Sequence, residues 1–261
     1  MIGVFDSGIG GLIVLSALIK QIPGYDFLYF GDTARAPYDT KSPETIIDYT
    51  LKNIEFLKHQ GAKVIVLSCN TVASVATDMV IERFDVPVFE GITPVAQLAQ
   101  KTSRYQRIGI IGTRTTIISG IYKKKILDIN PEAKVFSAAC PLLVPLIEEN
   151  WIKKPEAKMI VKKYLQPLKV RQIDTLILGS FYYAVLAKII KVKIGKRVHM
   201  IDSSIVLAEG LRGFLKKHDE IDKLLGKTGK SRYMVSDLTQ HVEKIAKSMF
   251  KGNIRLEAVR I

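Results

Sequence analysis

The sequence has only two cysteines, Cys69 and Cys140, among its 261 residues. So low a number excludes a framework held by several disulfides, which is typical of small secreted proteins. No apolar stretch reaches the roughly 20 residues that a membrane-spanning helix needs, because Lys, Asp or Gln interrupts each one. The first residues are strand-like rather than a basic segment followed by an apolar signal core. We therefore expect a cytoplasmic protein, not associated with a membrane, in which Cys69 is a free thiol.

Motifs for nucleotides and nucleic acids are also missing. The segment Asp6–Gly11 follows an apolar run and opens a helix, but Ile13 occupies the third glycine position of a dinucleotide fingerprint, and no Gly-Lys-Ser/Thr follows. The formal charge is +14, yet clusters such as Lys123–Lys125 lack the interleaved aromatic residues of a single-strand binder. We expect a solvated basic surface; steering of an anionic substrate ranks second, and nucleic-acid binding third.

Strand-like and helix-like segments alternate along the chain, which predicts an α/β fold with mainly parallel sheets flanked by helices. A helix is predicted at Pro43–His59, with Ser42 as its N-cap, and another at Pro155–Leu165. After residue 207 we expect a helix, a turn at Gly226–Gly229, a strand near Tyr233, a helix and a terminal strand, which return to the first lobe. The predicted strands are Ile2–Phe5, Asp26–Phe30, Val64–Leu67, Val86–Phe89, Ile108–Ile111, Lys134–Ser137, Thr175–Leu178 and His199–Ile201.

Two pairs of segments look like copies of each other, which indicates duplication. The runs that end at Cys69 and at Ser180 are both apolar and stop at small polar residues, and the strands at Ile2 and Ile108 precede them at a similar spacing. Strands in any α/β protein resemble one another, but two matched pairs in the same order favour two pseudo-symmetric lobes. We predict lobes of residues 1–94 with 207–261 and of residues 95–206, with an active site in the cleft between them, approached by Cys69 and Ser180 from opposite sides.

Polar loops follow three of the strands in the first half of the chain. They are Asp6–Gly11, Gly31–Asp39 and Cys69–Thr71. Ligands of open α/β sheets gather at the carboxyl ends of the strands, so we expect these loops to form a binding edge. Asp6 could simply cap a helix, but its place at this edge favours a carboxylate that adjusts a neighbouring proton carrier.

These segments, taken together, resemble the glutamate racemases of the aspartate/glutamate racemase superfamily. The resemblance covers the whole chain and is carried by Phe5–Gly11, Phe30–Tyr38, Cys69–Thr71, Ile111–Arg114, Ala139–Glu149, Asp174–Gly179 and Ile201–Ser203. It implies two α/β lobes, no cofactor and no metal, a homodimer, and a small dicarboxylate such as glutamate as the substrate. It also implies interconversion of L- and D-glutamate, which supplies D-glutamate for peptidoglycan.

Racemisation needs an acid/base group on each face of Cα, because the proton leaves one face and returns on the other. A thiol suits this task when helix N-termini and neighbouring groups lower its pKa from about 8.5. By the resemblance, Cys69 is one catalytic base, and Asp6 and Ser7 support it. The residues expected to contact the substrate are Asp6, Ser7, Tyr38, Asp39, Asn70, Thr71, Thr113, Phe181 and Tyr182.

The chain departs from this family mainly in the loop of the second base. The family reads Gly-Cys-Thr-His-Tyr-Pro there, whereas this chain reads Gly179-Ser180-Phe181-Tyr182-Tyr183-Ala184, and Asp39 replaces a glycine after Pro-Tyr. Ser180 is a far weaker acid than a thiol, so Tyr182, with a reference pKa of about 10, is a conceivable replacement donor. Phe181 and Tyr182 could instead only fill the pocket. Glu148 is either a secondary carboxylate or a solvated helix residue, and we expect Cys140 to be structural.

Three functions remain open at this point. The first is glutamate racemisation, with Cys69 on one face of the substrate and Ser180 or Tyr182 on the other. The second is an enzyme with a single competent cysteine, either a related racemase or a decarboxylase similar to the arylmalonate decarboxylases. The third is a binding or regulatory protein that has kept the scaffold. The intact loops around Asp6 and Cys69 argue against complete loss of catalysis, and the altered loop at Ser180 argues against full activity.

Overall fold

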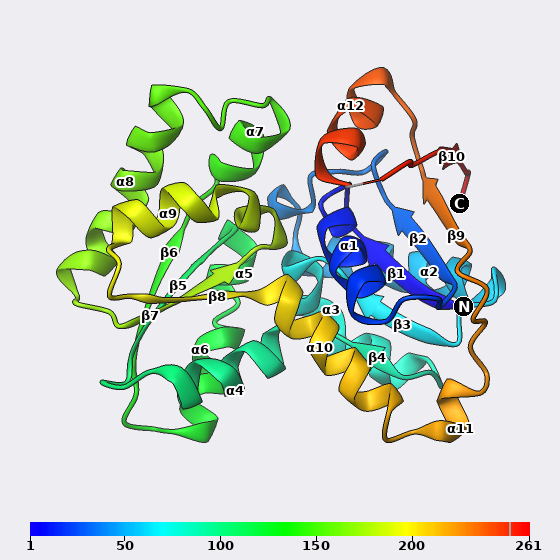
Figure 1. The fold of residues 1–261 in the computed structure, drawn as a ribbon, viewed down its shortest axis with the longest axis horizontal. Coiled ribbons are helices and arrows are strands. Elements are labelled where there is room, and N and C mark those ends of the chain that lie inside the picture. Colours follow the sequence, from blue (N-terminus) through cyan, green and yellow to red (C-terminus); the bar gives the residue numbers. More distant parts are fainter. Residues whose placement is uncertain (251) are drawn as a thin grey trace. The chain divides into compact units, whose positions relative to one another are not determined.

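A computed structural model gives the fold and describes residues 1–250 and 252–261. The chain forms two compact units. Unit 1 comprises Met1–Gly91 and Leu207–Ile261, and unit 2 comprises Ile92–Val206. Each unit contains one parallel β-sheet with helices packed around it, so the predicted α/β class with two mainly parallel sheets is confirmed (Figure 1).

The sheet of unit 1 has the strand order β10-β9-β2-β1-β3-β4. In the first part of the chain its elements are β1 (Ile2–Asp6), α1 (Gly11–Gln21), β2 (Phe27–Gly31), η1 (Tyr38–Thr40), α2 (Pro43–His59), β3 (Val64–Leu67), α3 (Asn70–Arg83) and β4 (Val88–Phe89). The last part adds α11 (Asp219–Asp222), β9 (Ser231–Val235), α12 (Gln240–Met249) and β10 (Leu256–Ala258), while α10 (Ser203–Leu215) begins in unit 2.

The sheet of unit 2 has the strand order β6-β5-β7-β8. Its elements are α4 (Ile92–Thr102), β5 (Arg107–Gly112), α5 (Arg114–Ile118), α6 (Ile121–Ile129), β6 (Lys134–Ala139), α7 (Leu143–Glu148), α8 (Pro155–Val170), β7 (Thr175–Gly179), η2 (Phe181–Leu186), α9 (Ala187–Ile194) and β8 (His199–Asp202). Among the described residues, no helix combines the length and the apolar composition needed to cross a membrane.

The two sheets share one topology. Strands β2-β1-β3-β4 of unit 1 lie in the same relative order as β6-β5-β7-β8 of unit 2. In each unit the first strand pairs with the two strands that follow it, and all of these pairs are parallel. Cys69 and Ser180 occupy equivalent positions, because each is the extended N-cap residue of the helix that follows β3 or β7. This equivalence supports the duplication that the sequence predicts.

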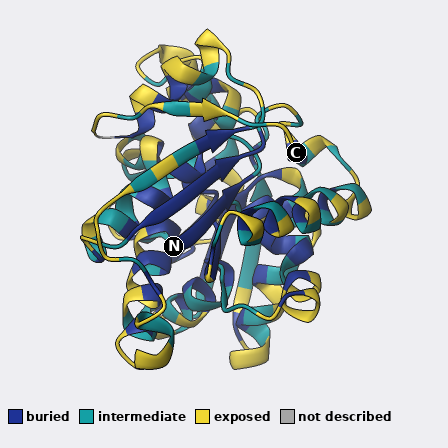
Figure 2. Cartoon of the chain, turned by 90° about the vertical axis from the view of Figure 1, so that its right-hand side faces the viewer, coloured by how far each residue is buried: buried dark blue, intermediate teal, exposed yellow. Residues whose placement is uncertain are grey.

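Buried apolar strands form the core of unit 1. Every residue of β1, β2 and β3 is buried, and Figure 2 shows these strands enclosed by helices with exposed outer faces. Strand β9 pairs with β2, from Phe27 opposite Ser231 to Gly31 opposite Val235. The prediction that the C-terminal segment returns to the first lobe is therefore confirmed.

The predicted helix boundaries are partly confirmed. Helix α2 begins at Pro43 and ends at His59, and the Ser42 hydroxyl accepts a hydrogen bond from the Thr45 N–H as the predicted N-cap. Helix α8 continues past Leu165 to Val170 because its buried stripe continues to Leu168. Strand β4 is shorter than predicted: Pro87 has no N–H to donate, and the Val86 N–H turns back to the Phe84 carbonyl.

Candidate active-site residues

The end of strand β1 and the end of strand β3 bring the first set of predicted site residues together. The two strands are parallel neighbours, with Phe5 paired to Leu67, so Asp6 and Ser7 emerge beside Cys69. The Ser7 hydroxyl and the Cys69 thiol form a hydrogen bond of 3.0 Å between Oγ and Sγ. Both cysteines of the chain are free, as the sequence predicts.

Asp6 contacts the loop that leads into helix α1. Its carboxylate oxygen Oδ2 accepts the Gly8 N–H at 3.1 Å, whereas Gly10 is the N-cap residue. The Asp6 side chain is almost fully buried, and its negative charge acts on Cys69. Of the two roles considered for this residue, this arrangement favours a carboxylate that adjusts the thiol.

The surroundings of Cys69 raise the pKa of its thiol to about 11. Burial is the main cause, because it disfavours the thiolate, and the negative charge of Asp6 acts in the same direction. Hydrogen bonds from Ser7 and from the backbone N–H groups of Val72 and Thr71 act in the opposite direction. The predicted contribution of the helix N-terminus is therefore present but outweighed, and Cys69 is a protonated thiol at neutral pH.

Tyr29 is a neighbour of this cluster that the sequence analysis did not single out. It lies on β2, is fully buried, and its hydroxyl donates to the Gly8 carbonyl at 3.4 Å. Burial, and then the charges of Asp6 and Cys69, raise the pKa of Tyr29 well above its ordinary value. Its position inside an apolar run gives no sign of this proximity, because only the strand order places β2 beside β1.

Two glycines allow the loops around Asp6 to approach each other closely. A Cβ atom at Gly11 would lie 2.3 Å from the Ser68 hydroxyl oxygen and 2.6 Å from the Asp6 Cβ. A Cβ atom at Gly31 would lie 2.1 Å from the backbone carbonyl oxygen of Gly8. Neither distance is possible for a real side chain, so both positions require glycine if the Asp6–Gly11 loop is to keep its place.

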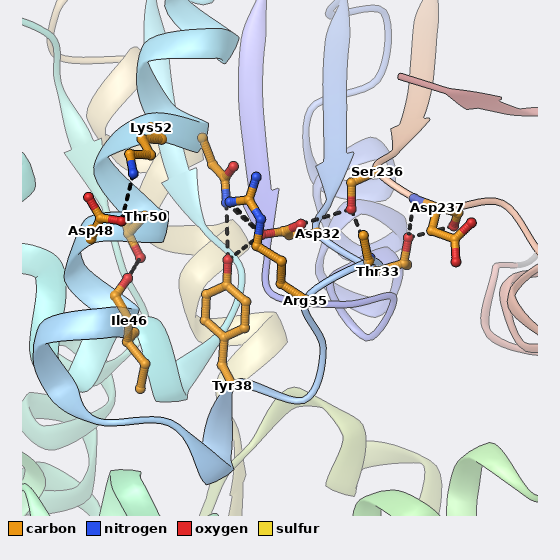
Figure 3. Close-up of polar contacts among 12 residues, drawn as sticks. Asp32, Thr33, Arg35, Tyr38, Ile46, Asp48, Thr50, Lys52, Ser236 and Asp237 are labelled. Carbon is orange, nitrogen blue, oxygen red and sulfur yellow. Dashed lines mark hydrogen bonds and ion pairs between the residues drawn. The ribbon is translucent and has the colours of Figure 1, made fainter. Parts of the chain in front are cut away.

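The long loop after β2 is organised by the buried carboxylate of Asp32 (Figure 3). The Tyr38 hydroxyl donates to Asp32 Oδ2 at 2.5 Å, and the Asn53 amide donates to the same oxygen at 3.1 Å. Arg35 forms an ion pair with Oδ2 as well, whereas the Ser236 hydroxyl donates to Asp32 Oδ1 at 2.8 Å. Asp32 could not be recognised from the sequence as the centre of this network, since Asn53 lies on α2 and Ser236 lies after β9.

This network disfavours ionisation of the Tyr38 hydroxyl. Its side chain is buried, and burial together with the Asp32 hydrogen bond raises the pKa of its hydroxyl. Asp39, the residue that replaces the family's glycine, follows it in η1. Asn70 and Thr71 open α3 directly after Cys69, and both side chains are buried.

The second set of predicted site residues lies at the end of β7 in unit 2. Ser180 and Phe181 are both buried, and the Tyr183 N–H donates to the Ser180 carbonyl at 3.0 Å. The Tyr182 hydroxyl donates to the Glu148 carboxylate at 2.6 Å. Glu148 is the last residue of α7, and the structure therefore places it against the loop that differs from the family. Of the two readings considered for it, the contact favours the secondary carboxylate.

Unit 2 contains two further residues that the sequence singled out, Cys140 and Thr113. The Cys140 side chain is fully buried, and the Tyr183 hydroxyl donates to the Cys140 carbonyl at 3.1 Å. Burial raises the pKa of the Cys140 thiol to about 12, which fits the expected structural role. Thr113 follows β5 as Ser7 follows β1, and its hydroxyl caps α5 by accepting the Thr116 N–H at 3.4 Å.

The fold and the thiol cluster define an α/β enzyme of the amino-acid racemase class. Residues 14–210 match the family model described as Asp/Glu/Hydantoin racemase. This match covers most of the chain, which belongs to that family.

Within the family, the chain is similar to glutamate racemases over its full length. It is 40% identical to the glutamate racemase of Geobacter metallireducens, with 97% of this chain and 93% of the relative covered. The solved structure of a glutamate racemase isoform from Bacillus anthracis matches with a TM-score of 0.93 at 33% identity, covering 100% and 97% of the two chains. The structure of the Francisella tularensis enzyme, in complex with D-glutamate, matches with a TM-score of 0.91 at 34% identity, covering 99% and 96%.

Proposed function

We propose that this chain is a glutamate racemase that interconverts L- and D-glutamate by proton transfer at Cα, without a cofactor, and so supplies D-glutamate for peptidoglycan. The observation that supports this most strongly is the contact of 3.0 Å between Ser7 and Cys69 beside the buried Asp6 carboxylate. The glutamate racemases to which the chain is similar, one of them solved with D-glutamate, support the substrate. We keep a cytoplasmic location and a homodimer as parts of this proposal.

Cys69 is the proposed proton carrier on one face of Cα. Because its pKa is about 11, the resting thiol is protonated and can donate a proton to a carbanion-like centre. In the reverse direction it must accept the Cα proton as a thiolate. The backbone N–H groups of Thr71 and Val72 and the hydroxyl of Ser7 favour this charge, so they lower the cost of forming it.

Tyr182 and Glu148 are the proposed proton carriers on the other face. A serine hydroxyl needs an adjacent base to take part in proton transfer, and the base contact of 2.6 Å belongs to Tyr182. As the Tyr182 oxygen takes the Cα proton, its own proton passes to the Glu148 carboxylate, and Tyr182 stays neutral. The reverse transfer returns a proton from Glu148 through Tyr182 to Cα. Ser180 is then a hydrogen-bonding residue rather than the second base.

The remaining predicted residues are proposed to hold the substrate. Ser7, Asn70, Thr71 and Thr113 supply hydroxyl, amide and backbone N–H groups at the ends of β1, β3 and β5. Asp39 and Phe181 would narrow the range of acceptable substrates. Tyr38 is better described as support for its loop, because its hydroxyl is held by Asp32 and Asn53.

Incubation with each glutamate enantiomer in D2O tests the function, with deuterium at Cα and optical rotation followed in the same sample. We expect deuterium uptake together with loss of rotation from both enantiomers. Uptake with retained rotation would instead indicate an enzyme with one competent base. This is the second candidate function, because Ser180 replaces the second cysteine of the family. No uptake from either enantiomer would overturn the proposal and favour a decarboxylase or a binding protein.

A further inference from the structure

The positive charge of the chain is concentrated in unit 2. Residues 92–206 contain 20 Lys and Arg against 7 Asp and Glu, a net charge of +13. The residues of unit 1 contain 19 Lys and Arg against 18 Asp and Glu, a net charge of +1. Almost all of the total of +14 therefore belongs to fewer than half of the residues. A solvated basic surface is the first expectation from the sequence, and the partition adds that the net charge is not spread evenly over the chain.

Within unit 2, the charge gathers on two helices that pack against each other, α8 and α9 (Figure 1). Residues 153–170 and 187–197 contain ten Lys and one Arg but a single acidic residue, Glu156. We call these two segments together the basic face. Most of its lysines, including Lys162, Lys163 and Lys188, are exposed, and none of them forms an ion pair with a carboxylate among the described residues.

Exposed apolar side chains lie among these lysines. Met159, Lys163 and Val170 are spaced so that they share one side of α8, and Met159 is 65% exposed. On α9, Val192 is 75% exposed and lies one turn from Lys188. Trp151, the one tryptophan of the chain, is 46% exposed and lies four residues before α8 begins.

This composition distinguishes between the polyanions that such a charge could bind. Nucleic-acid sites favour Arg, which binds phosphate with two parallel hydrogen bonds, and aromatic residues, which stack on bases. The basic face has ten Lys to one Arg, and its exposed non-polar residues are mainly aliphatic. Lysines with interspersed apolar side chains, and a tryptophan at the margin, are typical of surfaces that contact anionic lipid headgroups.

We propose that the basic face docks the protein on anionic phospholipid membranes as a peripheral, reversible contact. The lysines contact lipid phosphates, while Met159, Val170 and Val192 contact the upper part of the acyl region. The contact needs no membrane-spanning segment, but it departs from the expectation that the protein is not associated with a membrane. It is independent of the proposed racemase activity.

Trp151 provides an intrinsic probe of this contact in the full-length protein. Vesicles of phosphatidylglycerol and phosphatidylcholine should shift the tryptophan emission to shorter wavelength and should carry the protein into the pellet on centrifugation. Vesicles of pure phosphatidylcholine should do neither. Because the attraction is mainly electrostatic, we expect the bound fraction to fall at least about tenfold between 0.05 M and 0.5 M salt.

A matched pair of variants tests whether vesicle binding depends on the basic face or only on the net charge of the protein. The first replaces Lys162, Lys163, Lys188 and Lys196 by Gln, and the second replaces the exposed lysines Lys20, Lys216, Lys217 and Lys244 of unit 1 in the same way. We expect the first variant to lose at least about tenfold in vesicle affinity and the second to change less than about twofold. Circular dichroism confirms that both are folded.

Three results would overturn the proposal. The first is no binding of the parent protein to anionic vesicles at low salt. The second is an equal loss of affinity in both variants, which would show that only the total charge matters. The third is tighter binding to duplex DNA or to RNA than to vesicles at the same salt concentration, with dependence on the same four lysines, which would assign the face to nucleic acid.

Discussion

At the scale of single residues, the protonation state of Cys69 is the most informative quantity. Alkylation of a thiol proceeds through the thiolate, so its rate is proportional to the thiolate fraction. With a pKa of about 11, the rate of Cys69 alkylation by iodoacetamide should rise about tenfold per pH unit from pH 7 to pH 10. A plateau near pH 8.5 would contradict the raised pKa. The Cys69→Ser variant is the control, since its remaining thiol, Cys140, is fully buried and should not react.

The two neighbours of Cys69 shift this profile in opposite directions. The charge of Asp6 raises the pKa of Cys69, whereas the hydrogen bond of Ser7 lowers it. We therefore expect Asp6→Asn to speed the alkylation several-fold at pH 8 and Ser7→Ala to slow it. Shifts of the same sign in both variants would show that packing, rather than charge and hydrogen bonding, controls the thiol.

The second loop gives a contrast between two adjacent hydroxyl groups. If Tyr182 passes protons to Glu148, then Tyr182→Phe should reduce kcat by at least about 100-fold, the usual contribution of a proton-transfer group. Ser180→Ala should reduce it by less than about tenfold. Coupled measurement of D-glutamate formation from L-glutamate checks both values. The reverse ranking would return the role of second base to Ser180.

At the scale of elements, close packing between loops and strands decides where glycine is required. Gly31→Ala places a Cβ against the backbone oxygen of Gly8, so we expect a loss of about 1–3 kcal/mol in the free energy of unfolding. Gly210→Ala is the matched control, because Gly210 lies in α10 with no atom within 4 Å of the new Cβ. Because alanine favours the helix more than glycine does, Gly210→Ala should stabilise the protein by up to about 1 kcal/mol. Urea titration of both variants measures the difference, and equal effects would contradict the packing argument.

The elements were predicted well where a local signal exists. The predicted bounds of α2 match the structure, and its start was marked by the N-cap at Ser42, because capping depends on adjacent residues. Strands β1, β3, β5 and β7 were also predicted, because each is a local run of apolar residues. The contacts of Asp32 with Asn53 and Ser236 could not be predicted, since they join residues far apart in the sequence. The direction of the Cys69 pKa shift was also missed, because it depends on how deeply the thiol is buried.

At the scale of the whole molecule, the duplication visible in the sequence appears as two sheets of one topology. The duplicated positions have diverged in chemistry: one delivers Cys69 next to Ser7, and the other delivers Ser180 next to Tyr182, with Glu148 in contact. The concentration of net charge in unit 2 was missed because the charge was considered for the whole chain, although counting it over the predicted lobe of residues 95–206 gives the same result.

The proposed racemisation requires two different proton carriers, Cys69 and the Tyr182–Glu148 pair, that act on opposite faces of glutamate. The most direct measurement follows Cα deuterium exchange from L- and from D-glutamate in D2O, with the parent protein and the Cys69→Ala and Tyr182→Phe variants. We predict that the parent exchanges and inverts both enantiomers, while each variant loses inversion and still exchanges one enantiomer, a different one in each case. Inversion at the parent's rate in either variant, or exchange of the same enantiomer by both, would contradict the account.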